Sequence, residues 1–423
     1  MNKIIDEPDF ISRHRNSPKD FTRNRRLTFR TMIVFLMNLI RSSIQNELDI
    51  FFKTVNGKDV PESIVTDSAF FQARKKLKHE AFIELRQRTN EYFYNTYPCM
   101  RWHQFRLVAT DGSTAKVPKN PNCRDYFGEL VPNRGEPCPL GRVSQCFDVL
   151  NHNTIHATIS PKIVGERELA AEHLQCLGPG DLMLLDRGYP AFWLFSYILE
   201  KQVHFCARVN RNFAPDILSN FLLSDEKETI VSFEPSAATL SKCRKRNLPC
   251  SSLTLRVIRV DSKDIEDPVI LVTSLLDTRK YPYEIFADLY QQRWPVEEDY
   301  KLLKCRIEIE NFSGKSVESV KQDFYARIFT CNLTSMLAFP LHNVIDKKCT
   351  HRKYSYKINW TQAIAKMRNC GVLLFFRKNV HSIITKLQKL FLENLSEIRP
   401  GRHFPRKRRV SNKFWAFPYK PIS

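Results

Sequence analysis

Apolar residues in the first hundred positions recur every three to four residues, which predicts helices. A basic cluster leads into an apolar run at residues 21–43, and residues 66–93 open with Thr-Asp-Ser and are predicted to form one helix. The outer face of that helix is expected to carry four basic side chains, Arg74, Lys75, Lys76 and Lys78. Such a face is typical of a DNA-recognition helix, and equally of a solvated helix packed on a core.

The period of the pattern changes from helical to strand-like at Arg101. Apolar or alternating runs predict five strands, with one helix before and one after the fourth strand. The strands are expected at residues 105–111, 142–151, 154–161, 181–185 and 203–209, and the helices at 166–177 and 191–200. Three strands followed by helix, strand, helix and strand predict an α/β fold, a mixed sheet whose centre is covered on both faces.

Residues 210–283 lack helical periodicity and contain three runs of β-forming residues separated by turn residues. This stretch is predicted to be a β-rich insertion. Helical periodicity returns at Tyr283 and recurs in two later apolar stretches. The chain closes with residues 399–423, which hold eight basic residues and no acid and are expected to form an extended arm.

Charge narrows the choice of partner: 66 Lys and Arg stand against 45 Asp and Glu, a formal net charge of +21. Positive charges in such excess repel one another and oppose compact folding unless a polyanionic partner neutralises them. Nucleic acid is therefore the first partner expected, and an anionic membrane the second. The most apolar run, residues 31–40, has about half the length that a bilayer crossing needs. No membrane partner is therefore expected, and the lack of a signal-peptide pattern predicts a cytoplasmic protein. The twelve cysteines include no CxxC pair, which argues against a zinc site.

Two acidic side chains are predicted at strand ends, where the ligand sites of open α/β sheets gather. Asp111 follows the apolar residues 107–110, and Asp186 follows 182–185. Neighbouring carboxylates in apolar surroundings repel each other unless a cation lies between them. Oxygen ligands select Mg²⁺ or Mn²⁺, so a divalent-metal site is one interpretation. The other is that each Asp caps the element that follows it.

Residues 287–314, ADLYQQRWPVEEDYKLLKCRIEIENFSG, are predicted to be helical. At 3.6 residues per turn, four polar residues share one stripe of this helix: Tyr290, Arg293, Glu297 and Lys304. The neighbouring acids Glu298 and Asp299 point elsewhere. The stripe is either a solvated face with incidental ion pairs or a third carboxylate flanked by two cations.

Pro295 is compatible with either interpretation, and the apolar residues beside the stripe favour the second. Pro295 is tolerated if the helix restarts there, because proline fits a first turn. Leu289, Val296 and Leu303 form an adjacent apolar stripe, which indicates a helix packed on a core. A third carboxylate crossing the two Asp-bearing strands would complete a two-metal site of the kind that cleaves and transfers phosphodiesters.

These residues resemble the motifs of the DDE transposases of insertion sequences, in particular the insertion-sequence-four group. That group carries Tyr, two residues, Arg, three residues, Glu, six residues and Lys, a pattern that runs here from Tyr290 to Lys304. Its Asp-x-Gly-Tyr motif matches residues 186–189, and its Asp-Gly-Ser motif matches residues 111–113. The group also carries a β-rich insertion between the second Asp and the Glu.

The resemblance implies an RNase H-like core in which Asp111, Asp186 and Glu297 are catalytic and bind two Mg²⁺ ions, with Mn²⁺ as a substitute. A metal-activated water would nick DNA at the terminal inverted repeats, and the freed 3′-hydroxyl would attack the opposite strand or a target. The implied partner is double-stranded DNA, bound by a homodimer in the nucleoid of a bacterial cytoplasm. The expected DNA-binding residues are Tyr290, Arg293, Lys304, Arg187 and Tyr189, and, from the charge of the arm, Arg406, Lys407, Arg408 and Arg409.

The chain is predicted to divide into an N-terminal helical DNA-binding domain (1–100), a catalytic core in two parts (101–209 and 284–345), the insertion (210–283) and a C-terminal helical region with the basic arm (346–423). Family members that form a DNA hairpin use an aromatic residue, often Trp, in the insertion. No Trp lies between Asn210 and Tyr283, and Phe213, Phe221 or Phe233 are the expected substitutes. Two alternatives stay open: an inactive or domesticated DNA-binding protein, and a structure-selective nuclease on the same core.

Overall fold

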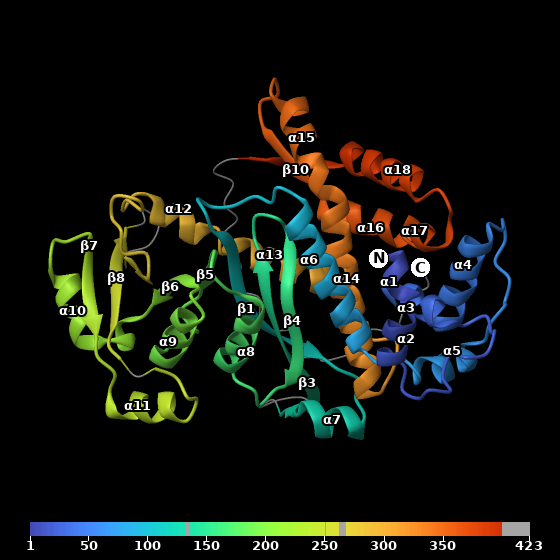
Figure 1. The fold of residues 1–423 in the computed structure, drawn as a ribbon, viewed down its shortest axis with the longest axis horizontal. Coiled ribbons are helices and arrows are strands. Elements are labelled where there is room, and N and C mark those ends of the chain that lie inside the picture. The colour runs from blue at the N-terminus through green and yellow to red at the C-terminus, as the bar shows by residue number, and fades with distance from the viewer. Residues whose placement is uncertain (132–135, 250, 262–267, 400–423) are drawn as a thin grey trace. The chain divides into compact units, whose positions relative to one another are not determined.

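The fold is described from a computed structural model, in which residues 1–131, 136–249, 251–261 and 268–399 are described (Figure 1). The chain forms two compact units. The sheet unit comprises Cys99–Ser113 and Arg142–Tyr300, and the helical unit comprises Met1–Pro98, Thr114–Gly141 and the chain from Lys301 onward. Three elements run through a boundary between the units: β1 (Arg106–Lys116), β3 (Cys138–Asp148) and α13 (Trp294–Cys305).

The sheet unit is built on one mixed sheet. Besides β1 and β3, its strands are β4 (Asn153–Pro161), β5 (Asp181–Leu185), β6 (His204–Val209), β7 (Glu228–Phe233), β8 (Leu253–Val260) and β9 (Val269–Thr273). The order is β3-β1-β5-β6-β9-β8-β7, and β4 pairs with β3. Strands β1, β5 and β6 are parallel, whereas β9, β8 and β7 continue antiparallel. The predicted α/β class, a mixed sheet flanked by helices, is confirmed.

The central strands form where the sequence is apolar throughout. All five residues of β5 are buried, as expected of a parallel strand covered on both faces. Helices α8 (Glu166–His173) and α9 (Phe192–Glu200) flank β5 in the chain and pack against each other (Figure 1). One strand end differs from the prediction: β1 runs past Asp111 to Lys116, because β3 stays hydrogen-bonded alongside it.

The predicted β-rich insertion contributes β7, β8 and β9, and β9 pairs with β6, so the insertion extends the main sheet. It also contains α10 (Pro215–Leu223) and α11 (Ala237–Arg244), so the expectation of no helix there is wrong. Local start signals place these short helices. Pro215 opens α10, and the Ser236 hydroxyl caps α11 by accepting the amide of Thr239 at 3.3 Å.

The helical unit confirms the predicted helices at both ends of the chain. Its elements are α1 (Asn2–Ile5), α2 (Pro8–His14), α3 (Phe29–Met37), α4 (Ile44–Asn56), α5 (Asp67–Arg74), α6 (Glu80–Thr96), α7 (Pro121–Phe127), β2 (Glu129–Leu130), α14 (Val317–Ala338), α15 (His342–Cys349), β10 (Ser355–Ile358), α16 (Trp360–Cys370), α17 (Leu373–Phe376), α18 (Val380–Glu393) and β11 (Leu395–Ile398). Helix α14 packs against α3, α6, α16 and α18 (Figure 1). Eight of the nine residues of α3 are buried, so its apolar run is core.

By length and composition alone, the segment Val317–Cys349 is long and apolar enough to cross a membrane. Its most apolar window is 56% buried inside the structure. Charged residues of α14 are buried with it: Asp323 and Arg327 are 3% and 2% exposed and hydrogen-bonded within the helical unit. These features are typical of the core helix of a folded domain.

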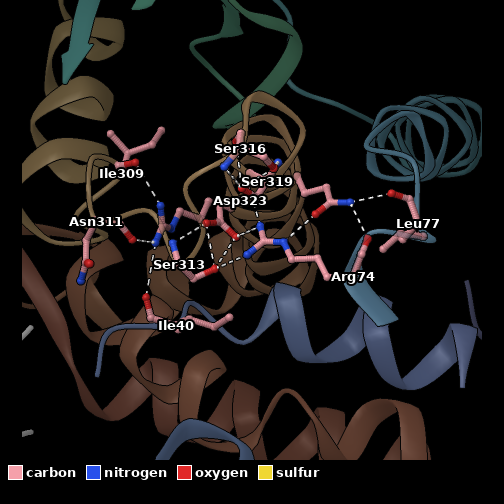
Figure 2. A network of polar contacts seen from close by, with 11 residues as sticks. Ile40, Arg74, Leu77, Ile309, Asn311, Ser313, Ser316, Ser319 and Asp323 are labelled. Carbon is pink, nitrogen blue, oxygen red and sulfur yellow. Dashed lines mark hydrogen bonds and ion pairs between the residues drawn. The ribbon is translucent and has the colours of Figure 1, made fainter. Parts of the chain in front are cut away.

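Residues 66–93 form two helices rather than the predicted one, since α5 ends at Arg74 and α6 begins at Glu80. Arg74 is not on an outer face: it is 3% exposed and sits at the centre of a polar network (Figure 2). Its guanidinium donates at 2.6 Å to the side chains of Gln322, Ser313 and Asp323 and to the carbonyl of Ser319. A buried arginine is stable when each of its N–H donors has an acceptor. The break at residues 75–79 ends α5 at Arg74, where these acceptors lie.

Candidate active site

Asp111 and Asp186 lie at matching positions on adjacent strands of the sheet unit. Strands β1 and β5 are parallel, and Thr110 is paired with Leu185, so the next residue on each chain is one of the two acids. Strand β5 ends at Leu185, which places Asp186 at its carboxyl edge. Both acids are half-buried. The register of the sheet therefore brings these two predicted carboxylates together.

Glu297 comes from the segment that was predicted as one helix and is in fact two. Helix α12 (Ile285–Gln291) ends before Arg293, and α13 begins at Trp294, so Pro295 lies in a first turn as expected. The apolar stripe is confirmed as core by three side chains with no exposed surface, Leu289, Val296 and Leu303. The break leaves Arg293 in a turn, beside the first turn of the helix that carries Glu297.

Helix α13 is tied to β1 within the sheet unit. The Tyr300 hydroxyl donates to the backbone carbonyl of Asp111 at 3.0 Å. The preceding residue, Asp299, is 4% exposed and accepts a hydrogen bond from the Gln145 amide at 2.8 Å, and burial raises the pKa of Asp299 to about 6. Because Asp299 is committed to the core and Glu298 is exposed, Glu297 is the acid of this trio that faces the other two carboxylates.

Electrostatics show that the three carboxylates share one environment. Burial, together with the charges of Glu297 and Asp186, raises the pKa of Asp111 to about 6. The Gly112 amide, which donates to Asp111 at 2.9 Å, and the charge of Arg293 oppose that rise. Arg293 also forms an ion pair with Glu297 at 2.5 Å. This guanidinium therefore compensates the acidic cluster in the protein alone.

Several buried polar groups beside the carboxylates have no hydrogen-bond partner among the described residues. They are the hydroxyls of Tyr189 and Tyr290 and two of the three guanidinium nitrogens of Arg293. Tyr189 and Arg293 are 2% and 7% exposed. Buried donors without partners are costly, so a cluster of them indicates a place where a ligand supplies the acceptors.

All three candidate carboxylates fall within a segment that matches a known protein family. Residues 102–333 match a family model described as the transposase DDE domain. That match covers more than half of the chain. The chain belongs to the DDE-domain transposase family. The resemblance stated from the motifs is thereby confirmed.

Two curated transposases show the extent of the likeness. The transposase InsG for insertion sequence element IS4 of Escherichia coli is 22% identical over 98% of this chain and 92% of its own length. A putative transposase, y4zB of Sinorhizobium fredii, is 23% identical over 38% of this chain and 43% of its own length. A solved synaptic complex of piggyBac transposase with hairpin DNA superimposes with a TM-score of 0.45 at 10% identity, covering 96% of this chain and 87% of that one.

A DDE transposase site needs oxygen ligands for divalent ions, and the three carboxylates supply that donor set. In the described part of the chain, a set of three ligand atoms within 4.8 Å of one another occurs at His79, Glu80 and Glu318 of the helical unit. Asp111, Asp186 and Glu297 do not form such a set. Two-metal sites place their ions about 3.5–4 Å apart, so one ion need not touch all three acids.

The remaining predicted DNA-binding residues differ in their exposure and in the unit to which they belong. Arg187 is exposed on the turn after β5, whereas Tyr189 is buried. Lys304 lies on α13 but belongs to the helical unit. The roles of these three residues in DNA binding stay predictions. The four arm residues lie outside the described part of the chain: Arg406, Lys407, Arg408 and Arg409.

A fourth carboxylate near the site was not predicted from the sequence. Glu166, at the start of α8, packs so closely on Gly112 that a β-carbon there would lie 3.2 Å from the Glu166 side chain. Arg142 holds Glu166 in an ion pair at 2.7 Å. Neither residue stands in a motif, and only the sheet topology brings them beside Asp111. Of the three expected stacking residues of the insertion, Phe221 and Phe233 are each 4% exposed and belong to the core, whereas Phe213 is half-buried.

The raised pKa of Asp111 predicts that its carboxylate destabilises the metal-free fold. The folded protein retains this proton up to about pH 6, whereas the unfolded chain loses it near pH 3.8, so stability falls as pH rises between these values. Asp111→Asn is therefore expected to raise the free energy of unfolding by roughly 1–3 kcal/mol at pH 8 in EDTA, the lower figure allowing for solvent screening.

Urea unfolding at pH 8 and at pH 3.5 tests this expectation. At pH 3.5 the carboxyl is protonated in the folded state and largely protonated in the unfolded chain, so most of the gain should vanish. Glu298→Gln, at an exposed position on the same helix, is the control for loss of one acid. If Asp111→Asn and the unmodified protein unfold at the same urea concentration at pH 8, Asp111 does not carry the repulsion assigned to it.

Proposed function

We propose that this chain is an active transposase that binds the terminal inverted repeats of an insertion sequence and catalyses metal-dependent cleavage and strand transfer in cut-and-paste transposition. The family supports a transposase activity, and one observation of the site carries the finer proposal. Asp111, Asp186 and Glu297 act on one another electrostatically in a half-buried place compensated by Arg293. Such a cluster is unfavourable without a ligand, which is typical of a catalytic site.

The donor set supports a pair of Mg²⁺ ions, with Mn²⁺ as a substitute, held by Asp111, Asp186 and Glu297. When bound, the ions would activate the attacking oxygen and stabilise the leaving oxygen of a phosphodiester. The pKa of Asp111, about 6, shows that burial disfavours its ionised form. Cations at this place are supported by the same observation, because a divalent ion would favour the ionised carboxylate.

The chain's own side chains would bind and orient the DNA phosphate. The unpartnered nitrogens of Arg293 and the hydroxyl of Tyr290 are the donors available beside the carboxylates. A guanidinium with two free N–H groups suits two oxygens of one phosphate. Arg293 would then hold the scissile phosphate while its neighbour Glu297 turns to the metal side. Tyr300 would keep α13 against β1 through its hydrogen bond to the Asp111 carbonyl.

Double-stranded DNA is the proposed partner, because the net charge of +21 suits a polyanion and gives binding a strong dependence on salt. Cleavage of two element ends in step supports a homodimer on the DNA.

A single incubation separates the proposal from its alternatives. The protein is mixed with linear DNA that carries the element's ends, in Mg²⁺ or in EDTA. Joined products that appear only with Mg²⁺ are expected. DNA binding without cleavage would indicate an inactive DNA-binding protein, and cleavage without joining would indicate a nuclease. Products that form equally in EDTA would contradict the metal-dependent mechanism.

A further inference from the structure

A cavity of about 1120 Å³ lies within the helical unit. Among the described residues predicted for the active site, Lys304 lines this cavity and the others do not. It exceeds the roughly 300–1,000 Å³ of an ordinary small-molecule site. Its wall is formed by α5, the start of α14, the segment 310–316, and Lys116 to Lys119. Ser313, Ser316 and Ser319, which Figure 2 shows beside Arg74, line it.

The polar network fixes this wall. Arg74 ties α5 to Ser313 and to the first turns of α14 through bonds of 2.6 Å. Gly314 completes the close approach, because a β-carbon at this position would lie 2.5 Å from the Ser319 hydroxyl and 3.1 Å from an Arg74 nitrogen. A buried network whose members are matched holds one arrangement. The cavity is therefore preformed rather than an accident of loose packing.

The cavity presents aromatic and apolar surface. Phe71 of α5 is 37% exposed although it is a large ring on a helix whose neighbour Phe70 has no exposed surface. Phe312, half-buried, and Pro118 also line the hollow. These apolar groups, gathered in one hollow, offer a surface on which flat apolar groups of a ligand can pack.

The same cavity is bordered by cations. Five lysines line it: Lys75, Lys116, Lys119, Lys304 and Lys315. Burial lowers the pKa of Lys304, and the structure records no hydrogen bond or ion pair for its ammonium among the described residues. A partly desolvated ammonium of this kind is a ready anion site.

Four acids also line the cavity, and most already have partners. Glu318 accepts from the ring and the amide of His79 at 2.9 and 2.7 Å. Glu310 accepts the amide of Lys116 at 3.0 Å, and Glu308 lies 3.4 Å from the Asn311 amide nitrogen. The fourth acid is Asp67. Five lysines therefore stand against four acids in the lining, and one of these lysines, Lys119, already forms an ion pair with Glu136.

We propose that this cavity binds a short unpaired stretch of a DNA strand, with bases on Phe71 and the apolar wall and phosphates at Lys75 and Lys304. Aromatic surface combined with a lysine border is the combination that binds single strands without regard to sequence. A duplex could not stack its bases on these rings, because its bases stack on one another and only their edges are accessible in the grooves. This inference rests on the proposed function, which supplies opened DNA ends.

The test uses the full chain and a fluorescein-labelled twelve-nucleotide oligo-dT, followed by anisotropy in EDTA. Phe71→Ala is expected to weaken binding roughly tenfold, and Phe71→Trp should retain it, because stacking tolerates any aromatic ring. Phe71→Ala with Lys75→Ala should weaken it further. Tyr92→Ala is the matched control, since Tyr92 is an aromatic residue of the same unit that is 65% exposed and does not line the cavity.

Affinity for a blunt twelve-base-pair duplex should change less than about twofold in Phe71→Ala, since phosphate contacts dominate duplex binding. Unchanged single-strand affinity in the double variant would overturn the cavity proposal, whatever the strand-transfer assay shows. Conversely, ring-dependent single-strand binding in a protein that never joins DNA would sustain the cavity and refute the proposed function. Thermal unfolding of each variant checks that the substitution has not altered the fold.

Discussion

Asp111→Asn is expected to reduce cleavage of transposon-end DNA by about a thousandfold or more while changing affinity for that DNA less than about threefold. The substitution keeps the shape of the side chain and removes a charged oxygen ligand. Stabilisation of charge in the reaction is usually the largest catalytic contribution, and an amide supplies little of it to a metal ion. Binding should persist, because the many phosphate contacts of a chain with net charge +21 do not depend on this carboxylate.

Single-turnover cleavage of an end-labelled duplex in Mg²⁺, beside a gel-shift titration, measures both quantities. Glu298→Gln is the matched control, because it removes one acid from the exposed side of α13 and should cleave normally. A variant Asp111→Asn that cleaves within about tenfold of the unmodified protein would remove Asp111 from the catalytic set. The same variant is expected to be more stable in EDTA, so a loss of cleavage cannot be ascribed to unfolding.

The pair Asp111 and Asp186 could be predicted from sequence because each follows a short apolar run, and parallel strands align their ends. Spacing alone also placed the apolar stripe of α12 and α13 in the core. The extent of β1 could not be predicted, because β3, a strand far along the chain, decides where it stops pairing. The helices of the insertion depend on local caps that periodicity does not register.

Arg74 shows why a charge pattern is a weaker guide than an apolar one. On a helical wheel it belongs with the neighbouring lysines, but it is buried against partners more than two hundred residues later, Ser313 and Asp323. Nothing local distinguishes a solvated arginine from one whose donors are matched by distant acceptors. The pair of Glu166 and Arg142 is hidden in the same way, since only the folded sheet brings it beside Gly112.

Arg293 occupies an unusual position among these buried charges, because it is the cation that the three carboxylates share in the absence of metal. It forms an ion pair with Glu297, and its charge acts on Asp111 and Asp186 as well. Replacing one partner of a buried ion pair leaves the other uncompensated, which costs about 3–5 kcal/mol. Arg293→Gln is therefore expected to lower the free energy of unfolding by about that amount in EDTA.

Bound Mg²⁺ should restore part of this loss, since divalent ions can replace the guanidinium as counter-charge for Asp111, Asp186 and Glu297. The gain in stability on adding Mg²⁺ is expected to be larger for Arg293→Gln than for the unmodified protein. Urea unfolding with and without Mg²⁺ measures both gains. Arg399→Gln, which breaks an exposed ion pair with Glu397, should leave unfolding unchanged in either buffer. If Mg²⁺ raised the stability of Arg293→Gln no more than that of the unmodified protein, the ions and the guanidinium would not be neutralising the same carboxylates.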